Sequence, residues 1–490
     1  MLSDVLKVSP EEKLMKAQIK TLTEKLALQQ MQMAEKKLPV VVLVEGWDTA
    51  GKGSLIGGLI NPIDPRFYRV ATLERFTEED QRLSFIGRYF KELPENGKFV
   101  FLDSGWMTQV TREYLYGTIS DEQYQTRIQS INNFERQLAD NGYLLVKLFL
   151  HITEDEQEKR VRKLNKSQDT SWRISEDDTF QNGHYGRFYQ VFESYIRATD
   201  TEKAPWHIID SSSKRWARLQ ALEILTDALE TALNKEKVPA AIPENVFPLV
   251  KQPKLAEISL ADKVLEDKEY DKRLKELQKE LRGLHNKIYR KKIPVIIAYE
   301  GWDAAGKGGN IKRVAKALDP RGFEVIPIAS PLPHEKARHF LWRFYVRLPK
   351  TGHITVFDRT WYGRVMVERL EGFCSENDWQ RAYNEINEFE KDLTDWGAVV
   401  IKFWVQIDKD TQLKRFTDRQ NTPEKQWKIT DEDWRNREKW DLYEAAVDEM
   451  IAKTSTEFAP WHVLESVDKK YARIKALEII VEELKKACKR

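Results

Sequence analysis

Hydrophobic residues in the second half of the chain alternate between short continuous runs and helical stripes. The run 294–299 is wholly apolar, as expected for a parallel strand that is buried on both faces. Similar runs predict strands at 323–328, 354–357, 399–405 and 461–464, with helices between them, notably 335–345, 378–393 and 410–420. This alternation predicts an α/β fold with a mostly parallel sheet flanked by helices.

A long helical stripe precedes this alternation. Its apolar residues are spaced by four and three, which places them on one face of an amphipathic helix. They are Tyr270, Leu274, Leu277, Leu281, Leu284 and Ile288. Such a helix either packs on its own domain or pairs the two halves of the chain, and the spacing favours neither.

The pattern occurs twice in the chain without a gap. A shift of 255 residues (301 − 46 = 255) moves Gly46 onto Gly301, and the same shift aligns Asp103 with Asp358. A period of this length indicates domain duplication rather than a solenoid. Between the copies, prolines interrupt any helix or central strand; they are Pro239, Pro243, Pro248 and Pro253. We therefore predict tandem domains at 1–237 and 261–490, joined by a linker at 238–260.

A glycine-rich loop follows the predicted strand at 294–299. It reads EGWDAAGKG over residues 300–308 and has the G-x-x-x-x-G-K spacing of phosphate-binding loops. The candidate phosphate ligands are the backbone N–H groups of Gly301, Ala304, Ala305, Gly306 and Gly308, with the ammonium of Lys307. Gly308 stands where a metal-binding hydroxyl residue is usual, so we assign metal binding to Asp303 instead. A purely structural turn is the weaker interpretation, because the loop recurs at 45–53.

A carboxylate and two arginines follow a later strand. Asp358 ends the predicted strand at 354–357 and matches the second metal-holding position of phosphotransferases with such loops. A strand-ending Asp can also cap a helix. Arg359 and Arg364 would stabilise charge on a transferring phosphoryl group, although surface salt bridges are a competing interpretation. The predicted catalytic residues are Lys307, Asp303, Asp358, Arg359 and Arg364, with Asp303 and Asp358 as metal ligands.

Basic residues also gather in the predicted helix at 410–420. Lys414, Arg415 and Arg419 lie there, and the two arginines share a helix face because they are four residues apart. This segment and the basic residues that follow it are suited to close over a phosphate chain as a lid, and phosphate contact by Lys414, Arg415 and Arg419 is what the family resemblance given below implies. Acidic residues are nearly as frequent there, so a solvated helix surface is the alternative. For His462 we prefer core packing to catalysis.

The two halves differ in these basic residues. Under the 255-residue shift, the first half has Ser104 for Arg359, Met107 for Tyr362, Gln109 for Arg364 and Leu164 for Arg419. It retains the loop with Lys52, and Asp103. We therefore expect catalysis in the second half, with a degenerate first half as its structural partner.

Composition sets few further limits. The chain has 490 residues, 41% of them hydrophobic and 32% charged, and a net charge of +2. That charge is too small for nonspecific capture of nucleic acid or membranes, and we expect neither as a partner. Only two cysteines, Cys374 and Cys488, are present, which excludes a disulfide framework. Without an apolar signal core or a membrane-spanning run, the sequence predicts a cytoplasmic protein.

These motifs together resemble the polyphosphate kinase 2 family. The resemblance rests on the loop Gly301–Gly308, Asp358-Arg-Thr-Trp-Tyr-Gly-Arg364, Gln426-Trp-Lys428, and Thr454-Ser-Thr456 followed by Ala459-Pro-Trp461. It implies P-loop kinase-like domains with a mobile lid and a requirement for Mg²⁺. The tandem layout is similar to the branch that phosphorylates AMP to ADP with inorganic polyphosphate, using its C-terminal domain.

Other functions fit parts of the sequence. A polyphosphate-dependent ADP kinase shares the motifs, and an ATP-dependent P-loop kinase for a nucleotide or small molecule shares the loop. A non-catalytic phosphate-binding scaffold is credible for residues 1–237 only. The substrates implied are polyphosphate and a nucleoside mono- or diphosphate. The duplication would make an internal pseudo-dimer, and it also permits a homo-oligomer.

Overall fold

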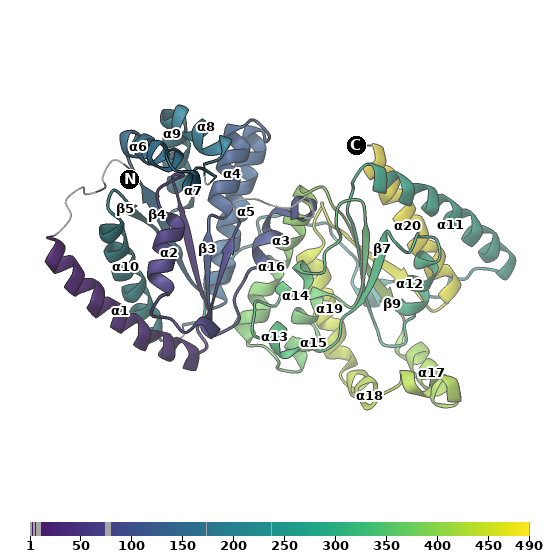
Figure 1. Ribbon diagram of the computed structural model, residues 1–490. Helices are drawn as coiled ribbons and strands as arrows, with labels where there is room; N and C mark the ends of the chain where they lie inside the picture. The colour runs from purple at the N-terminus through teal and green to yellow at the C-terminus, as the bar shows by residue number, and fades with distance from the viewer. Residues whose placement is uncertain are drawn as a thin grey trace. The chain divides into compact units, whose positions relative to one another are not determined.

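The structure is a computed structural model that describes residues 2, 5, 11–73, 80–172, 174–236 and 238–489. Each half of the chain contains a five-stranded parallel sheet flanked by helices (Figure 1). The predicted α/β class and its duplication are confirmed. The strand order is β2-β3-β1-β4-β5 in the first half and β7-β8-β6-β9-β10 in the second, so the two sheets have the same topology.

The first half begins with a long helix and then alternates strand and helix. Its strands are β1 (Val40–Gly46), β2 (Tyr68–Thr72), β3 (Phe99–Asp103), β4 (Leu144–His151) and β5 (Trp206–Asp210). Its helices are α1 (Glu12–Glu35), α2 (Lys52–Ile60), α3 (Phe85–Phe90), α4 (Trp106–Leu115), α5 (Asp121–Asp140), α6 (Glu154–Asn165), α7 (Gln168–Ser171), α8 (Glu176–Gly183), α9 (Tyr185–Thr199) and α10 (Lys214–Asn234).

The second half repeats this order with more interrupted helices. Its strands are β6 (Val295–Gly301), β7 (Phe323–Pro327), β8 (Ile354–Asp358), β9 (Val399–Gln406) and β10 (Trp461–Glu465). Its helices are α11 (Asp267–Arg290), α12 (Lys307–Ala315), α13 (Pro333–Lys336), α14 (Trp342–Tyr345), α15 (Val367–Leu370), α16 (Glu376–Asp395), α17 (Lys409–Gln420), α18 (Asp431–Glu438), α19 (Trp440–Thr454) and α20 (Lys469–Lys489). All five predicted strands are confirmed to within two residues at each end.

The central strand β6 positions the glycine-rich loop. It pairs with β8 on one side and β9 on the other, with Tyr299 opposite Asp358 and Gly301 opposite Val405. Its residues are buried on both faces because helices cover both sides of the sheet. The loop therefore leaves the sheet at its carboxyl edge, where strand order reverses and α/β proteins bind ligands.

The predicted helix at 335–345 is wrong, since two short helices, α13 and α14, stand there instead. Between them the backbone finds partners outside any helix. The carbonyl of Ala337 accepts from the N–H of Asn96 at 2.8 Å, and the N–H of His339 donates to the hydroxyl of Tyr143 at 3.1 Å. These backbone groups cannot also serve a continuous helix, so the helix is interrupted.

This interruption belongs to a reciprocal exchange. The chain forms two compact units that divide at Val238, but residues 333–339 belong to the first unit and residues 80–87 to the second. In the second unit, Arg82 donates to the carbonyl of Thr351 at 3.0 Å and accepts from its N–H at 3.2 Å. The two segments overlap under the 255-residue shift, which places residues 80–87 on 335–342. The linker after Val238 belongs to the second unit.

Helix α11 packs on its own unit. Figure 1 shows it alongside α20, and Tyr270 shares a buried cluster with Ile474. Arg273 pairs with Glu478 of α20, and Lys485 of α20 pairs with Glu280 at 2.6 Å. Of the two interpretations of the apolar stripe, packing within the domain is the one that the structure supports.

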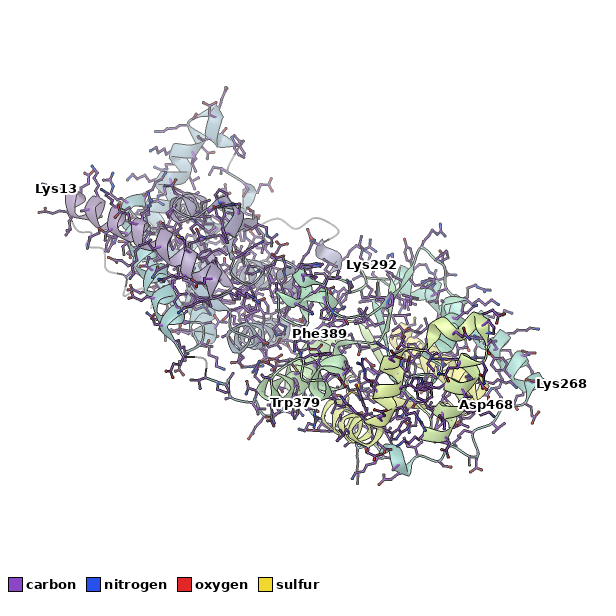
Figure 2. The ribbon with its side chains drawn as sticks, turned by 90° about the horizontal axis from the view of Figure 1, so that it is seen from below. Lys13, Lys268, Lys292, Trp379, Phe389 and Asp468 are labelled. Atoms are coloured by element: carbon purple, nitrogen blue, oxygen red, sulfur yellow. The ribbon has the colours of Figure 1, made fainter. Side chains whose placement is uncertain are left out.

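The cores of both units are rich in aromatic side chains. Phe389 is buried within the helical layer, whereas Lys268 is exposed near the start of α11, as Figure 2 shows. Both cysteines are free thiols. Among the helices in the described ranges, none combines the length and the apolar character needed to cross a membrane.

Candidate active site

The loop between β6 and α12 needs glycine at two positions. Gly301 has a φ of +149°, and a Cβ there would lie 2.6 Å from the carbonyl oxygen of Val405. Gly306 has a φ of +115° and immediately precedes α12. Both conformations are open to glycine and strained for other residues. The resulting turn places the N-terminus of α12, where the N–H groups of Lys307 and Gly308 begin the helix, at the carboxyl edge of the sheet.

Arg415 holds this loop from behind. Its guanidinium donates to the carbonyls of Ala304 (3.0 Å) and Ala305 (2.9 Å), and to those of Ser466 (2.5 Å) and Val467 (3.0 Å). Burial, followed by the repulsion of Arg419, lowers the pKa of Arg415 to about 10. The first half has the same arrangement, with Arg160 bonded to four equivalent carbonyls. These contacts favour support of the loop, and direct phosphate contact by Arg415 stays a prediction.

Lys307 begins α12, and its ammonium lies over the loop. It donates to the carbonyls of Gly301 (2.5 Å) and Trp302 (3.3 Å), and the side chain is partly exposed. Gly308 is exposed beside it, and no heavy atom would approach a Cβ there within 4 Å. A phosphate at the start of α12 would therefore meet both a positive charge and open backbone.

Asp303 links the loop to two other segments. One carboxylate oxygen lies 3.5 Å from the guanidinium of Arg359, and the other accepts from Asn436 of α18 at 3.0 Å. The backbone of Arg359 has a φ of +65°, and its N–H donates to the carbonyl of Tyr299 at 3.0 Å. A left-handed non-glycine residue costs about 1 kcal/mol or more, so the surroundings must hold it in place. The structure thus brings Asp303 and Arg359 together, with the arginine side chain 53% exposed.

Asp358 ends β8 at the same edge of the sheet. It lies opposite Tyr299, two residues before Gly301 on the neighbouring strand, and it is partly exposed. In the described ranges no three His, Cys, Asp or Glu side chains gather as a metal cage. Mg²⁺ commonly uses one or two carboxylates and completes its shell with substrate oxygens and water, so Asp303 and Asp358 fit this ion.

Glu300 is a site residue that the sequence analysis missed. It is buried, and one carboxylate oxygen accepts from both the N–H and the hydroxyl of Thr360 at 2.7 Å. Burial raises the pKa of this carboxyl, against the opposing effect of Lys307. Glu300 thereby ties the loop strand to the arginine segment. The sequence does contain a signal for this residue, because a glutamate precedes the loop in both copies, Glu45 in the first and Glu300 in the second.

Arg364 has different neighbours from Arg359. It lies in the 3₁₀ turn η5 (Trp361–Val365), pairs with Glu368 at 2.9 Å and stacks 4.6 Å from the ring centre of Phe340. Within the described part of the chain, its ion pair and ring contact are with Glu368 and Phe340 and not with the loop. Its predicted role in stabilising the transferred group therefore stays a prediction.

The predicted lid is helical and touches the loop. Helix α17 carries the exposed Lys414 and the partly exposed Arg419. The ring of Trp440, at the start of α19, stacks on Trp302 of the loop with centres 3.7 Å apart. The side chains of Lys425 and Lys428 lie outside the described residues. The sequence analysis did not single out Asn436, because an amide in a charged helix carries no signal by itself.

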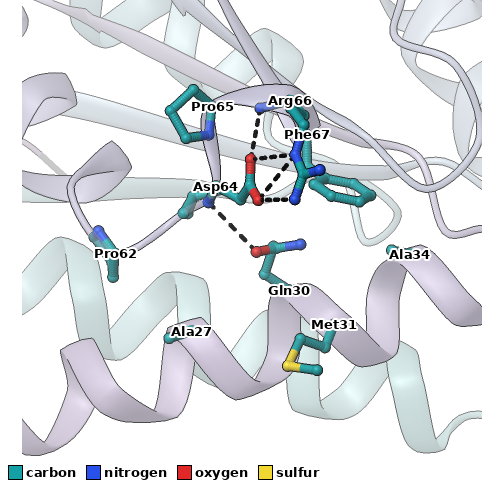
Figure 3. A pocket seen from close by; sticks show the side chains of 10 residues that line it. Ala27, Gln30, Met31, Ala34, Pro62, Asp64, Pro65, Arg66 and Phe67 are labelled. Atoms are coloured by element: carbon teal, nitrogen blue, oxygen red, sulfur yellow. Dashed lines mark hydrogen bonds and ion pairs between the residues drawn. The ribbon is translucent and has the colours of Figure 1, made fainter.

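The first half also has a hollow of about 860 Å³ away from its loop, between α1 and the turn Pro65–Phe67 (Figure 3). There Asp64 accepts from the backbone N–H of Arg66 at 2.9 Å and from its guanidinium at 2.6 Å, and Gln30 lies beside them. Small side chains such as Ala34 line it, whereas the equivalent residue in the second half is Tyr289. This hollow has no part in the site at the loop.

The family model for polyphosphate kinase 2 matches residues 9–237 and 264–490. The chain belongs to the polyphosphate kinase 2 family. It is 39% identical over 480 residues to a polyphosphate:AMP phosphotransferase from Pseudomonas syringae pv. tomato, covering 96% of this chain and 95% of that protein. It is 38% identical to a protein of the same name from Pseudomonas aeruginosa, covering 93% and 92%.

A crystal structure of a protein described as a polyphosphate kinase 2, from Pseudomonas aeruginosa PA01, has the same fold. It aligns with a TM-score of 0.86 at 35% sequence identity and covers 99% of both chains. The tandem arrangement of two polyphosphate kinase 2 regions is therefore shared along the full length of this solved structure.

The two polyphosphate kinase 2 regions differ around the loop aspartate. In the first, Asp48 lies 3.2 Å from Arg112, and its N–H donates to the side-chain oxygen of Gln181 at 2.8 Å. The Asp48 side chain is 5% exposed, against 18% for Asp303. The residues equivalent to Arg112 and Gln181 are Val367 and Asn436. The first loop thus satisfies both its carboxylate and a backbone donor from within the protein.

Proposed function

We propose that the second half of the chain transfers a phosphoryl group from inorganic polyphosphate to AMP, giving ADP. One observation carries the proposal: beside the exposed Gly308, the Asp303 carboxylate is 18% exposed and is flanked by Arg359 and Asn436, whereas Asp48 is only 5% exposed and lies against the partly exposed Arg112. The choice of polyphosphate and AMP follows the names of the relatives that match along nearly the whole chain.

The residues of the second half have separate roles in this reaction. The N-terminus of α12 and Lys307 bind the donor phosphates, with loop contacts from Gly301, Ala304, Ala305, Gly306 and Gly308. Arg359 stabilises charge on the transferring group, and Arg364, Lys414 and Arg419 act from the surrounding turn and lid. The acceptor phosphate of AMP is already anionic near neutral pH. Alignment and charge stabilisation therefore matter more than a general base.

We assign Mg²⁺ to Asp303 and Asp358. A bound Mg²⁺ would neutralise negative charge on the phosphate oxygens and so reduce the repulsion between the donor and acceptor phosphates. The protein's own contribution is to hold the two carboxylates at one edge of the sheet, with Asn436 and Arg359 orienting Asp303.

We further propose that the first half is a structural partner and that the two halves form an internal pseudo-dimer, since their sheets share one topology. Association into a homo-oligomer would be additional. A cytoplasmic location suits the nucleotide substrate and the two free thiols.

The test is an assay of the full chain with AMP, Mg²⁺ and polyphosphate in the absence of ATP. We expect ADP to form. Parallel reactions with ADP as acceptor, and with ATP as donor to AMP, separate the alternatives. Faster ATP formation from ADP would replace the proposal with an ADP kinase, and turnover with ATP but not polyphosphate would replace it with an ATP-dependent kinase.

A further inference from the structure

A fully buried ammonium lies beneath the turn that carries Arg364. Lys402 of β9 donates to Glu390 (2.7 Å), to the carbonyl of Thr454 (2.7 Å) and to the hydroxyl of Tyr362 (2.8 Å). The Tyr362 hydroxyl in turn donates to Glu390 at 2.7 Å, and Trp361 donates to the same carboxylate at 3.1 Å. All three donors of the ammonium are therefore used, as a buried charge requires.

The first half contains the same arrangement without the tyrosine. Lys147 donates to Glu135 and to the carbonyl of Thr199, each at 2.7 Å, and Trp106 donates to Glu135 at 2.9 Å. Met107 occupies the position of Tyr362. The lysine–glutamate pair thus persists in a folded unit that has no phenol at this point, so the phenol is not required to build the pair.

The backbone differs where the tyrosine differs. In the first half, the segment from Trp106 continues as the regular helix α4, ten residues long. In the second half it forms the 3₁₀ turn η5, breaks at Met366 (φ −115°, ψ −92°), and resumes as α15. The tight turn occurs in the half where the hydroxyl is tied to the buried pair, and that turn begins two residues after Arg359 and contains Arg364.

We propose that Tyr362 is a positioning residue for the transfer reaction, whose hydroxyl anchors the turn and so sets the placement of Arg359 and Arg364. This inference rests on the proposed function of the second half. Tyr362 has no contact with substrate in this role and acts through the two arginines. Glu300 holds the same segment through Thr360, so two residues that lie between the arginines in the chain are each bonded to a buried carboxylate.

The test is Tyr362→Phe, which keeps the ring and removes only the hydroxyl. Tyr270→Phe is the matched control, because Tyr270 is a buried tyrosine of the same unit whose hydroxyl has no hydrogen-bond partner among the residues that the structure describes. We expect Tyr362→Phe to lower kcat about tenfold with the KM for AMP within about twofold, since misplaced arginines weaken the transition state more than binding. Its Tm should fall by less than about 4 °C.

A double-mutant cycle separates positioning from general destabilisation. If Tyr362 acts through the two arginines, Tyr362→Phe should cost little further activity in a background that carries both Arg359→Ala and Arg364→Ala. Multiplicative losses would overturn the proposal, as would an unchanged kcat in Tyr362→Phe.

Hydrogen exchange gives a reading that needs no substrate. Amides of residues 360–366 should exchange faster in Tyr362→Phe than in the wild type and in Tyr270→Phe. Unchanged exchange there would overturn the proposal even if the enzyme proved to have another substrate. An inactive wild-type protein with faster exchange in Tyr362→Phe would count against the proposed function while supporting the anchoring role.

Discussion

The guanidinium of Arg112 lies 3.2 Å from the carboxylate of Asp48, and the residue equivalent to Arg112 in the second half of the chain is Val367. An internal cation thus stands beside the loop aspartate of the first half. In the second half the same carboxylate meets the more exposed Arg359 and an amide. This difference concerns electrostatics and not the backbone, since both loops have the same glycine geometry.

The two loop lysines should therefore differ in their effect on turnover. We expect Lys307→Ala to reduce kcat at least about 100-fold, because it removes the ammonium nearest the phosphate loop. Lys52→Ala should leave kcat within about twofold, because Asp48 of the first loop is already bonded to Arg112 and Gln181. Steady-state ADP formation from AMP and polyphosphate measures both. A larger loss in Lys52→Ala would move the reaction to the first half.

Asp303 should control the requirement for metal. Asp303→Asn keeps the shape of the side chain but removes the charge, so we expect the Mg²⁺ concentration for half-maximal activity to rise about tenfold or more. Asp48→Asn is the matched control and should leave it unchanged. A chelator should abolish turnover, and added Mg²⁺ should restore it. Equal Mg²⁺ dependence in wild type and Asp303→Asn would remove Asp303 from the metal site.

Arg415 should matter for stability as well as for activity. Arg415→Met removes a donor from four backbone carbonyls, of which that of Ala305 keeps the hydroxyl of Ser466, and we expect this to cost about 2–3 kcal/mol in the free energy of unfolding. The loop would lose its support, so kcat should also fall. Arg160→Met should cost similar stability in the first half without lowering kcat. Denaturant unfolding and the transfer assay distinguish this from direct phosphate contact, for which Arg415→Met would lower kcat with unchanged stability.

His285 should make the stability of the second unit depend on pH. Its Nδ1 accepts from the N–H of Asp319 at 3.1 Å, which requires that nitrogen to be unprotonated, and burial lowers the pKa of the imidazole. Between that lowered pKa and the ordinary value of about 6.5, the unfolded chain binds more protons than the folded one. The stabilisation is therefore complete above about pH 6.5 and falls as the pH drops toward the folded pKa.

The first half supplies the control for this pH dependence. Gln30 occupies the position equivalent to His285 and accepts from the N–H of Asp64. His285→Gln should therefore fold and should lose part of the decrease in unfolding free energy between about pH 7 and pH 5. Denaturant titrations of both proteins at several pH values measure this difference. Identical pH profiles would show that His285 does not titrate in this range.

Several elements follow from local sequence alone. The strand at 294–299 and the helix at 410–420 were predicted within two residues, because continuous apolar runs and helical spacing are properties of adjacent residues. The glycine loop could also be read directly, since Gly301 and Gly306 adopt conformations that few other residues tolerate. The shift of 255 residues establishes the duplication without any knowledge of the fold, because it needs only matching residues at a constant separation.

Other features depend on residues far apart in the chain. The helix predicted at 335–345 is interrupted because two of its backbone groups bond to distant residues, one to the N–H of Asn96 and the other to the hydroxyl of Tyr143. The residues within the segment carry no signal of these bonds. Helical spacing placed Arg415 and Arg419 on one face, but only the fold brings Ser466 and Val467 against Arg415 and turns it toward the loop. The assignment of residues 333–339 to the first unit and 80–87 to the second also depends on contacts between residues far apart in the chain.

The sequence by itself determined the α/β class, the tandem repeat, the phosphate loop and the half that retains the arginines. The tertiary structure decided which charged side chains are bonded to other groups of the protein and which are exposed to a ligand. The physical reason is that periodicity and glycine chemistry are local, whereas the partners of a charged group come from whichever distant segments the fold brings within about 3 Å.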